Sequence, residues 1–233
     1  MQISQKLKNQ IYFVIAAYNE ERSIGNVLSE LLKNSYSHIV VVNDGSKDKT
    51  SEIILQYEGV TLLEHVINRG QGAALKTGID YALKQDDCKY IVTFDADGQH
   101  RLSDLPNFIE ALETGKYDIA IGSRFLSEES AKLVPFKKRF LLKGALAVTW
   151  FLSGISLSDT HNGYRVMNKT AAKQIEMSLD GFEHASEIID EIAKKRVKYK
   201  EIPVFIDYTE YSKQKGQKMS NSLKIMAKMI LKK

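Results

Sequence analysis

The sequence predicts an α/β fold in which helices flank a mostly parallel central sheet, with a basic amphipathic helix at the C-terminus. Short apolar runs alternate with segments of helical spacing through the first half of the chain, as in β-α-β units. Polar residues that can bind ligands follow four of these runs. Residues 211–233 contain seven lysines and no acidic residue.

Five apolar runs have the length and composition of strands that are buried on both faces. They are Ile11–Ala17, Ile39–Val42, Val60–His65, Tyr90–Phe94 and Tyr117–Ile121. Because helical patterns separate them, these strands are expected to be parallel.

The segments between the runs carry apolar residues three or four positions apart, which is typical of amphipathic helices. Helices are predicted over 23–32, 71–83 and 105–112, and a further helix follows the second run, with Ser46 or Asp48 as its N-cap. In the second half, residues 159–165 form a turn before a short strand, and helices are predicted over 171–177 and 185–195. Residues 197–207 contain Pro203 and predict a pair of short strands or one edge strand.

No internal repeat or linker divides the chain, so a single domain is predicted over residues 1–219, followed by the basic helix over 220–233. The single cysteine, Cys88, excludes an internal disulfide or a zinc cluster and suits the cytoplasm. The N-terminus does not resemble a signal peptide. The longest apolar run, Gly144–Leu157, is too short to span a membrane.

The positive charge is concentrated at the C-terminus. Subtracting the seven lysines of residues 211–233 from the net charge of +4 leaves −3 for the preceding residues. Lys224, Lys228 and Lys232 form a stripe on the predicted helix, which favours an anionic membrane surface over packing on the domain. The basic and aromatic segment 133–157 is either a core helix or a second membrane contact. Nucleic acid is not an expected partner, because the tail lacks interleaved aromatic residues.

The strongest candidate for a functional site lies where the fourth run ends, at Asp95-Ala-Asp97-Gly98. Residues two apart in an extended chain project to the same face, so the two carboxylates are expected to converge. Their repulsion would raise one pKa unless a cation were bound, and Mg²⁺ or Mn²⁺ commonly takes one or two carboxylates together with substrate phosphates. An ordinary Asp-rich turn is the alternative.

Chemistry-bearing residues also follow three other runs, namely Glu20, Asp44 and Arg124. The carboxyl ends of parallel strands meet at one edge of a sheet, where open α/β folds bind ligands. The sequence therefore predicts a nucleotide-binding crevice at this edge.

Six segments resemble glycosyltransferase family 2, which has the GT-A fold, and in particular the polyprenyl-phosphate sugar synthases and small bacterial cell-surface polysaccharide glycosyltransferases. The segments are Ala16-Ala-Tyr-Asn-Glu20, Val42-Asn-Asp-Gly-Ser46, Asn68-Arg-Gly-x-Gly72, Asp95-Ala-Asp97-Gly-Gln-His100, Gly122-Ser-Arg124 and Asp159…Asn162-Gly-Tyr-Arg165. Ala16 departs from the family, which often has proline there.

The resemblance implies roles for individual residues. Those implied to bind the nucleotide are Ala16, Tyr18, Glu20, Asp44, Arg69, Asp95 and Ala96, with the glycines after Arg69 close to it. Asp97 would be the metal ligand, and Asp95, Asp97, Arg124 and Arg165 would be catalytic. The acceptor or its phosphate would meet Gln99, Arg124, Arg165, Lys213 and Lys218, with His100 nearby, although the lysine segment departs from the usual arginine and spacing.

The expected activity is inverting, metal-dependent transfer of a sugar from a nucleotide-sugar, by family a UDP-sugar, to a polyprenyl phosphate in cell-wall or surface polysaccharide synthesis. A phosphate acceptor needs no general base. A sugar hydroxyl on a lipid-linked oligosaccharide, the alternative acceptor, needs one, for which the candidates are Asp159, Glu183 and Glu187.

Three other classes of protein share parts of this pattern: a nucleotidyltransferase, a non-catalytic nucleotide-binding partner of a membrane protein, and a basic nucleic-acid-binding domain. As an enzyme acting on lipid, the chain is expected at the inner face of the cell membrane. A small integral membrane protein and a second copy of the chain are candidate partners.

Overall fold

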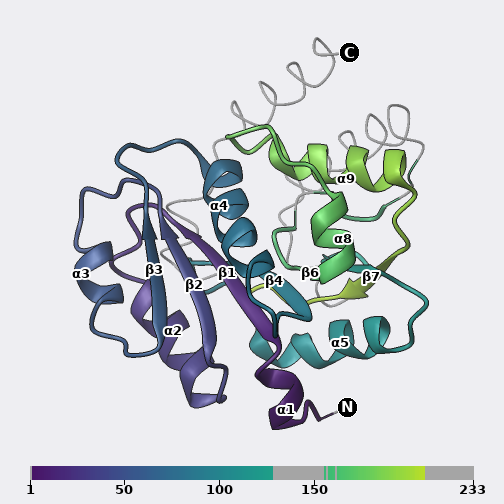
Figure 1. Cartoon of the computed structure of the whole chain (residues 1–233), viewed down its shortest axis with the longest axis horizontal. Helices are drawn as coiled ribbons and strands as arrows, with labels where there is room; N and C mark the ends of the chain where they lie inside the picture. The colour runs from purple at the N-terminus through teal and green to yellow at the C-terminus, as the bar shows by residue number, and fades with distance from the viewer. Residues whose placement is uncertain (1, 128–154, 156, 161, 208–233) are drawn as a thin grey trace.

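The computed structural model describes residues 2–127, 155, 157–160 and 162–207. Within these residues one sheet forms the centre of the molecule, and its strands follow the order β3-β2-β1-β4-β6-β5-β7 (Figure 1). The strands are β1 (Ile11–Ala17), β2 (His38–Asn43), β3 (Val60–Glu64), β4 (Tyr90–Asp95), β5 (Ile119–Ser123), β6 (Arg165–Asn168) and β7 (Tyr199–Pro203).

Helices precede or connect these strands. They are α1 (Gln5–Lys8), α2 (Ile24–Lys33), α3 (Thr50–Ile54), α4 (Gln71–Leu83), α5 (Leu105–Glu113), α8 (Lys169–Gln174) and α9 (His184–Lys195), with a 3₁₀ turn, η1 (Leu102–Asp104), before α5. Among the described residues no helix is long and apolar enough to cross a membrane.

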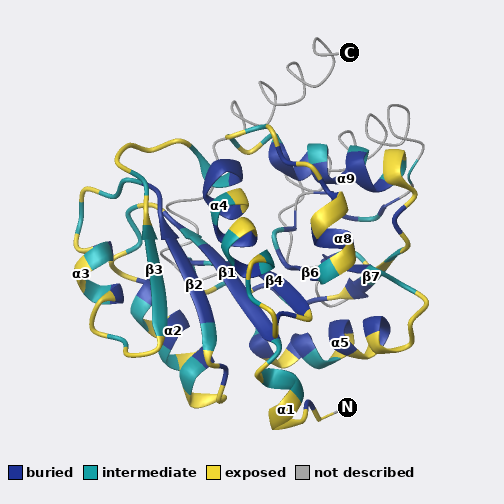
Figure 2. Ribbon diagram, viewed as in Figure 1, coloured by how far each residue is buried: buried dark blue, intermediate teal, exposed yellow. Residues whose placement is uncertain are grey.

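The helices cover the sheet on both faces and produce two apolar cores. Side chains of α2, α3 and α5, such as Leu28, Ile54 and Phe108, pack on one face. Side chains of α4, α8 and α9, such as Ile79 and Ile188, pack on the other. Figure 2 shows the result, a sheet whose central strands are buried between two helical layers.

All strand pairs are parallel except those of β6, which runs antiparallel to both β4 and β5. Arg165, the first residue of β6, lies opposite Thr93 of β4 and Ile121 of β5. Because β6 is reversed, it begins at the edge where the other strands end. The structure therefore brings Arg165 to the edge that also holds the polar strand-end residues, which we call the carboxyl edge.

The predicted α/β class with a mostly parallel central sheet is confirmed, with local corrections. β5 begins two residues later than its apolar run, and it extends through Gly122 and Ser123 because β7 pairs with both. β7 is a single edge strand that ends at Pro203.

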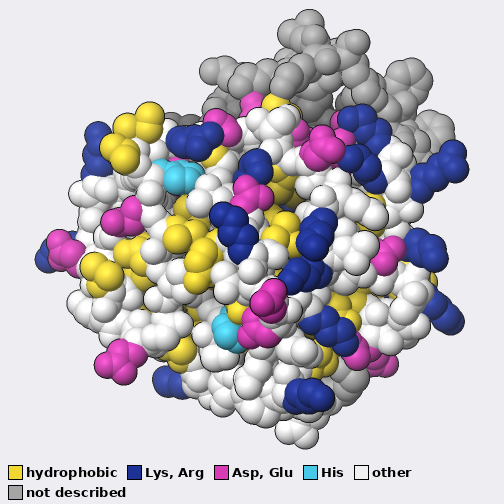
Figure 3. Space-filling view, in the orientation of Figure 1, with side chains coloured by type: hydrophobic (Ala, Val, Ile, Leu, Met, Phe, Trp, Pro, Cys, Tyr) yellow, Lys and Arg dark blue, Asp and Glu magenta, His cyan; other side chains and the backbone are white. Residues whose placement is uncertain are grey.

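The predicted N-cap of α3 at Ser46 or Asp48 is wrong. Lys49 occupies that position without a side-chain cap, because the Asp48 carboxylate instead accepts hydrogen bonds from the backbone and hydroxyl of Thr50. The predicted helix at 220–233 and most of the segment 133–157 lie outside the described residues. On the face drawn in Figure 3, acidic and basic side chains are interspersed over the described surface.

Candidate active site

The carboxyl edge gathers the loops that follow β1, β2, β4 and β5. Asn43 and Ala17 are paired across β2 and β1, and Ala16 is paired with Asp95 across β1 and β4, so the three strands end at nearly the same level. The loop between β3 and α4 and the segment before α9 lie along the same side, at the top of Figure 1. The order of the strands therefore brings together residues far apart in the sequence.

Asp97 lies in the tight turn that ends β4, where Gly98 adopts a positive φ of 72°. Its carboxylate accepts hydrogen bonds from the backbone N–H of Gln99 at 3.0 Å and from its Nε2 at 2.6 Å. Burial, and next the negative charge of Asp95, raise the pKa of Asp97 to about 6. A positively charged group bound close to Asp95 and Asp97 would reduce the repulsion between their carboxylates.

Asp95 is 30% exposed and lies between two donors. Oδ2 is 2.9 Å from Nε2 of His100, and Oδ1 accepts a hydrogen bond from Nε2 of Gln71 at 3.3 Å. Burial alone would raise the pKa of Asp95, but the charges of His100, Arg165 and His184 outweigh it and lower that pKa. Position 163 is glycine because a Cβ there would come within 2.8 Å of both carboxylate oxygens.

Arg165 is 1% exposed, and the described residues offer no hydrogen-bond partner to its Nε and Nη1. Burial lowers the pKa of this guanidinium to about 10, although the charges of Asp95 and Asp159 act in the opposite direction. It therefore stays protonated at neutral pH. A buried cation is costly when two of its nitrogens have no partner among the described residues, unless an anion is bound to it.

Arg124 has a different environment although it was assigned the same role from the sequence. Its Nε and Nη2 donate to the two carboxylate oxygens of Asp159 at 2.6 and 2.8 Å, and its backbone N–H also donates to Asp159. The Asp159 side chain is fully buried in this pair. Asp159 was predicted as a candidate base and Arg124 as a phosphate-binding residue. In the structure these two side chains neutralise each other's charge.

Asp44, at the end of β2, holds the loop before α4. Its carboxylate accepts hydrogen bonds from the backbone N–H groups of Arg69 and Gly70 at 3.0 and 2.7 Å, and lies 2.7 Å from Nδ1 of His65. Nε2 of His65 is in turn 2.9 Å from the Thr77 hydroxyl on α4. His65 was not singled out from the sequence, because it looked like the last residue of a strand.

The glycines after Arg69 lack side chains where another segment of the backbone approaches closely. A Cβ at Gly70 would lie 2.3 Å from the Asp180 carbonyl oxygen, and one at Gly72 would lie 2.1 Å from that of Leu179. Gly70 also has a positive φ of 115°. Close approach of residues 179–181 therefore explains both glycines, and the Arg69 guanidinium lies 3.5 Å from the Asp180 carboxylate on the same side.

The remaining residues implied to bind nucleotide lie around the ends of β1 and β4. Tyr18 is 41% exposed, and Ala16 and Glu20 are half-buried, while Ala96 is buried. Glu20 accepts a hydrogen bond from the Ser23 hydroxyl at 2.8 Å. These positions line the edge beside Asp44.

The two glutamates proposed as bases flank a residue that the sequence interpretation did not single out. Glu187 accepts hydrogen bonds from the backbone N–H groups of Ser178 and Leu179 at 2.9 and 3.0 Å, and Glu183 is the N-cap residue of α9. Between them His184 is 3% exposed, and burial, followed by the charge of Arg165, lowers its pKa to about 4. His184, Ile188 and Ile192 are four residues apart, and this helical spacing predicts that His184 faces the core together with the two isoleucines.

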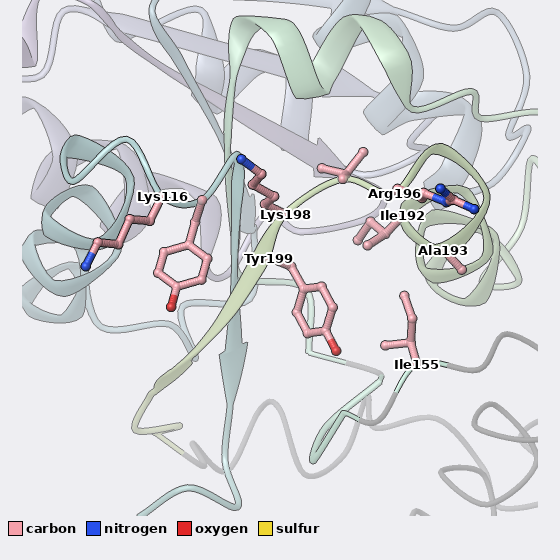
Figure 4. Close-up of a pocket in the computed structure, with 9 residues that line it drawn as sticks. Lys116, Ile155, Ile192, Ala193, Arg196, Lys198 and Tyr199 are labelled. Atoms are coloured by element: carbon pink, nitrogen blue, oxygen red, sulfur yellow. The ribbon is translucent and has the colours of Figure 1, made fainter.

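Two cavities formed by described residues lie away from this edge. One, of about 400 Å³, lies between the end of α9 and the start of β7 and is lined by Ile192, Arg196 and Tyr199 among others (Figure 4). The other, of about 350 Å³, lies between α4 and α8. No residue predicted for the site lines either cavity, so the candidate site is the open carboxyl edge. Lys213 and Lys218 lie outside the described residues.

The residues at the end of β4 fit a hard divalent cation. Two carboxylates separated by one residue supply oxygen ligands, and a cation would offset the charge of Asp95, which after burial is the next cause of the raised pKa of Asp97. Among the described residues no three His, Cys, Asp or Glu side chains gather closely enough to hold an ion. A cation here would thus need phosphate oxygens from a substrate to complete its ligands.

Comparisons with known proteins identify the family and the fold of the chain. The family model described as Glycosyl transferase family 2 matches residues 12–176. An uncharacterized protein of Methanocaldococcus jannaschii is 41% identical over 100% of this chain and 96% of its own length. The UDP-N-acetylglucosamine--dolichyl-phosphate N-acetylglucosaminyltransferase of Methanococcus voltae is 32% identical over 95% of each chain.

Among solved structures, glucosyl-3-phosphoglycerate synthase from Mycobacterium tuberculosis, in complex with Mn²⁺ and UDP-glucose, superposes with a TM-score of 0.67. The match covers 97% of this chain and 78% of that one at 18% identity. At this identity the likeness shows the fold, and the expected GT-A fold is confirmed.

Proposed function

The chain belongs to glycosyl transferase family 2 and is a hexosyltransferase, and from that premise we propose that it moves a sugar from a UDP-sugar to a polyprenyl phosphate. The named activity of the M. voltae relative, which matches this chain over nearly its whole length, supports this donor and acceptor. The product would serve cell-wall or surface polysaccharide synthesis, with the enzyme at the inner face of the membrane.

The observation that carries the proposal is the state of Arg165. Its buried guanidinium has two N–H groups that the described residues leave unpaired, and it lies at the edge where Asp95 ends β4. The planar fork of an arginine matches a phosphate oxygen pair. A diphosphate or an acceptor phosphate bound here would supply the missing partner.

The reaction requires the sugar to leave a nucleoside diphosphate while positive charge grows on the ring. Asp97, with Asp95, would hold Mg²⁺ or Mn²⁺, which when bound neutralises charge on the departing diphosphate. The guanidinium of Arg165 would bind a phosphate of the departing diphosphate or of the acceptor. Gln99 holds the Asp97 carboxylate through two hydrogen bonds and so fixes its direction.

Inversion at the anomeric carbon follows from direct attack by the acceptor. A polyprenyl phosphate is already an anion and needs no general base. Among the candidate bases, Asp159 pairs with Arg124, and Glu187 accepts hydrogen bonds from backbone N–H groups. These contacts favour the phosphate acceptor over a sugar hydroxyl, which would need a free base.

A lipid-dependent release assay tests the proposal. The protein is incubated with UDP-, GDP- or dTDP-sugars, Mn²⁺ or Mg²⁺, and undecaprenyl phosphate. We expect metal-dependent release of UDP that requires the lipid, and Asp97→Asn should reduce it about 10²–10³-fold. Asp86→Asn is the matched control. Asp86 is an exposed aspartate before the start of β4, whereas Asp97 follows its end, so this variant should leave release unchanged.

Other outcomes discriminate among the alternatives. Pyrophosphate release from a nucleoside triphosphate would indicate a nucleotidyltransferase, and UDP binding without turnover would indicate a non-catalytic partner. Release that needs a lipid-linked oligosaccharide would favour the hydroxyl acceptor. Equal activity of the Asp97 and Asp86 variants would refute the site.

A further inference from the structure

Exposed large hydrophobic side chains are unevenly placed on the molecule. Six occur among the described residues, namely Tyr18, Leu55, Val66, Ile67, Leu126 and Phe182. All but Leu55 lie on loops at the carboxyl edge or packed against it. Val66 is 99% exposed and Ile67 69% exposed, so neither contributes much to packing. Single exposed apolar residues are ordinary, but a group that surrounds a site marks an interaction surface.

Backbone contacts join most of these loops to one another. A Cβ at Gly45, after β2, would lie 2.7 Å from the Ile67 carbonyl carbon. Gly70, three residues after Ile67, touches Asp180, two residues before Phe182. We call Tyr18, Val66, Ile67, Leu126 and Phe182 the apolar rim. Its loops lie along the top of Figure 1, and Figure 2 shows the β3–α4 loop exposed there.

Positive side chains accompany the apolar rim. Lys47 and Lys49 are exposed on the loop after β2, and Arg69 is 51% exposed after β3. Figure 3 shows hydrophobic side chains over the β3–α4 loop beside Lys or Arg. The neighbouring carboxylates of Glu21 and Asp48 accept backbone hydrogen bonds. Exposed apolar residues with basic neighbours are suited to the surface of a bilayer that contains anionic lipid.

We propose that the apolar rim inserts into the surface of the lipid bilayer that holds the acceptor, so that the carboxyl edge and Arg165 face the membrane. The inference rests on the proposed function, because a polyprenyl phosphate presents its phosphate at the bilayer surface. The apolar rim thus contacts lipid molecules of the bilayer and not a protein partner.

Leu55 provides an internal control. It is 72% exposed and directly follows α3, in the segment that leads to β3, and it does not belong to the apolar rim. It therefore matches Ile67 in exposure but not in position. The single native cysteine, Cys88, is 3% exposed, which allows a probe to be attached elsewhere.

The first experiment attaches an environment-sensitive fluorophore to Ile67→Cys and to Leu55→Cys in the full chain. Vesicles of phosphatidylcholine with phosphatidylglycerol are then added without donor or metal. We expect a blue shift and increased emission for the probe at position 67 and no change at position 55. No change at either position, or an equal change at both, would overturn the proposal.

The second experiment measures vesicle partitioning by flotation. Val66→Ser with Ile67→Ser should lower the partition coefficient about tenfold, because two apolar side chains no longer enter the lipid. Leu55→Ser should bind as wild type. Partitioning of the rim variant equal to that of Leu55→Ser would contradict the proposal. UDP binding with Mn²⁺, measured without vesicles, tests the proposed function separately from the rim.

Discussion

Arg124 directly follows β5 and Arg165 begins the adjacent strand β6, so both lie at one edge of the sheet, and both are buried. Arg124 makes a two-fold hydrogen-bonded pair with Asp159. Arg165 has two N–H groups without a partner among the described residues. The same residue type, in the same kind of motif, is therefore internally neutralised in one strand and left charged in the next.

The difference separates a stabilising role from a binding role. A paired buried arginine is costly to remove because its carboxylate stays behind without a partner. An unpaired one destabilises the free protein and gains its partner only when an anion binds. We therefore expect substitution of Arg124 to lower mainly the free energy of unfolding, and substitution of Arg165 to lower mainly the rate of the reaction.

The largest expected effect is on stability. Arg124→Met leaves the buried Asp159 carboxylate without its guanidinium partner, so the free energy of unfolding should fall by about 3–5 kcal/mol. Chemical denaturation measures this directly. The double variant Arg124→Met with Asp159→Leu is the control and should recover much of the loss, because both charges of the buried pair are removed together. A single variant as stable as the wild type would remove the distinction between the two arginines.

Arg165→Met should give the complementary result. We expect lipid-dependent UDP release to fall about 10²–10³-fold, which corresponds to about 2.7–4 kcal/mol of transition-state stabilisation. The melting temperature should change much less than in the Arg124 variant, since an unpaired buried charge is removed. Arg165→Lys keeps the charge without the planar fork and should retain part of the activity. A large loss of stability with normal kinetics would reverse the assignment.

The pH dependence of stability provides a third measurement near Arg165. The pKa of His184 is lowered to about 4, so its folded form resists protonation. Its contribution is fully present above the unfolded pKa of about 6.5, and is lost as the pH falls from there towards 4, by at most about 3 kcal/mol. Urea unfolding at pH 7 and pH 4.5 should show a smaller acid loss in His184→Gln than in wild type.

The same titration sharpens the comparison between the two arginines. Removing the charge of Arg165 raises the pKa of His184, because that charge is one of its causes. Arg165→Met should therefore also lose less stability in acid. An identical acid loss in wild type and both variants would mean that His184 is not held neutral by its surroundings.

The smallest effect is expected for a third arginine, Arg101. Its Nε donates to the Asp207 carboxylate at 2.8 Å, but the two side chains are 42% and 50% exposed. Exposed pairs of this kind contribute about 0.2–1 kcal/mol, so Arg101→Met should cost no more. High salt should weaken the pair in the wild type. A loss as large as that of Arg124→Met would show that burial does not separate these arginines.

Much of the sheet could be predicted from the sequence because its central strands are buried on both faces. β1, β2 and β4 are continuous apolar runs, and the polar residues after them lie at one edge, as parallel strands require. The reversed β6 was not predictable in the same way. Its four residues, Arg165–Asn168, carry no periodic signal, and its direction depends on pairing with strands on both sides.

The site was predictable as a set of positions but not as a set of contacts. The sequence placed Asp95 and Asp97 together, and it left a structural salt bridge open for Arg124, but it did not identify Asp159, 35 positions later, as the partner. The glycines at positions 70 and 72 suggested an approaching ligand, whereas the backbone of residues 179–181 occupies that space. Partners distant in sequence decide which polar groups remain available, and spacing along the chain does not report them.

The reversal of β6 also affects how this fold can diversify. The polypeptide leaves β5 after Ser123 and enters β6 at Arg165, so it departs from and returns to the same border of the sheet. Insertions or deletions between these two points leave the register of every strand unchanged. Evolution can therefore alter the length and composition of this excursion while the strand order of the sheet is retained.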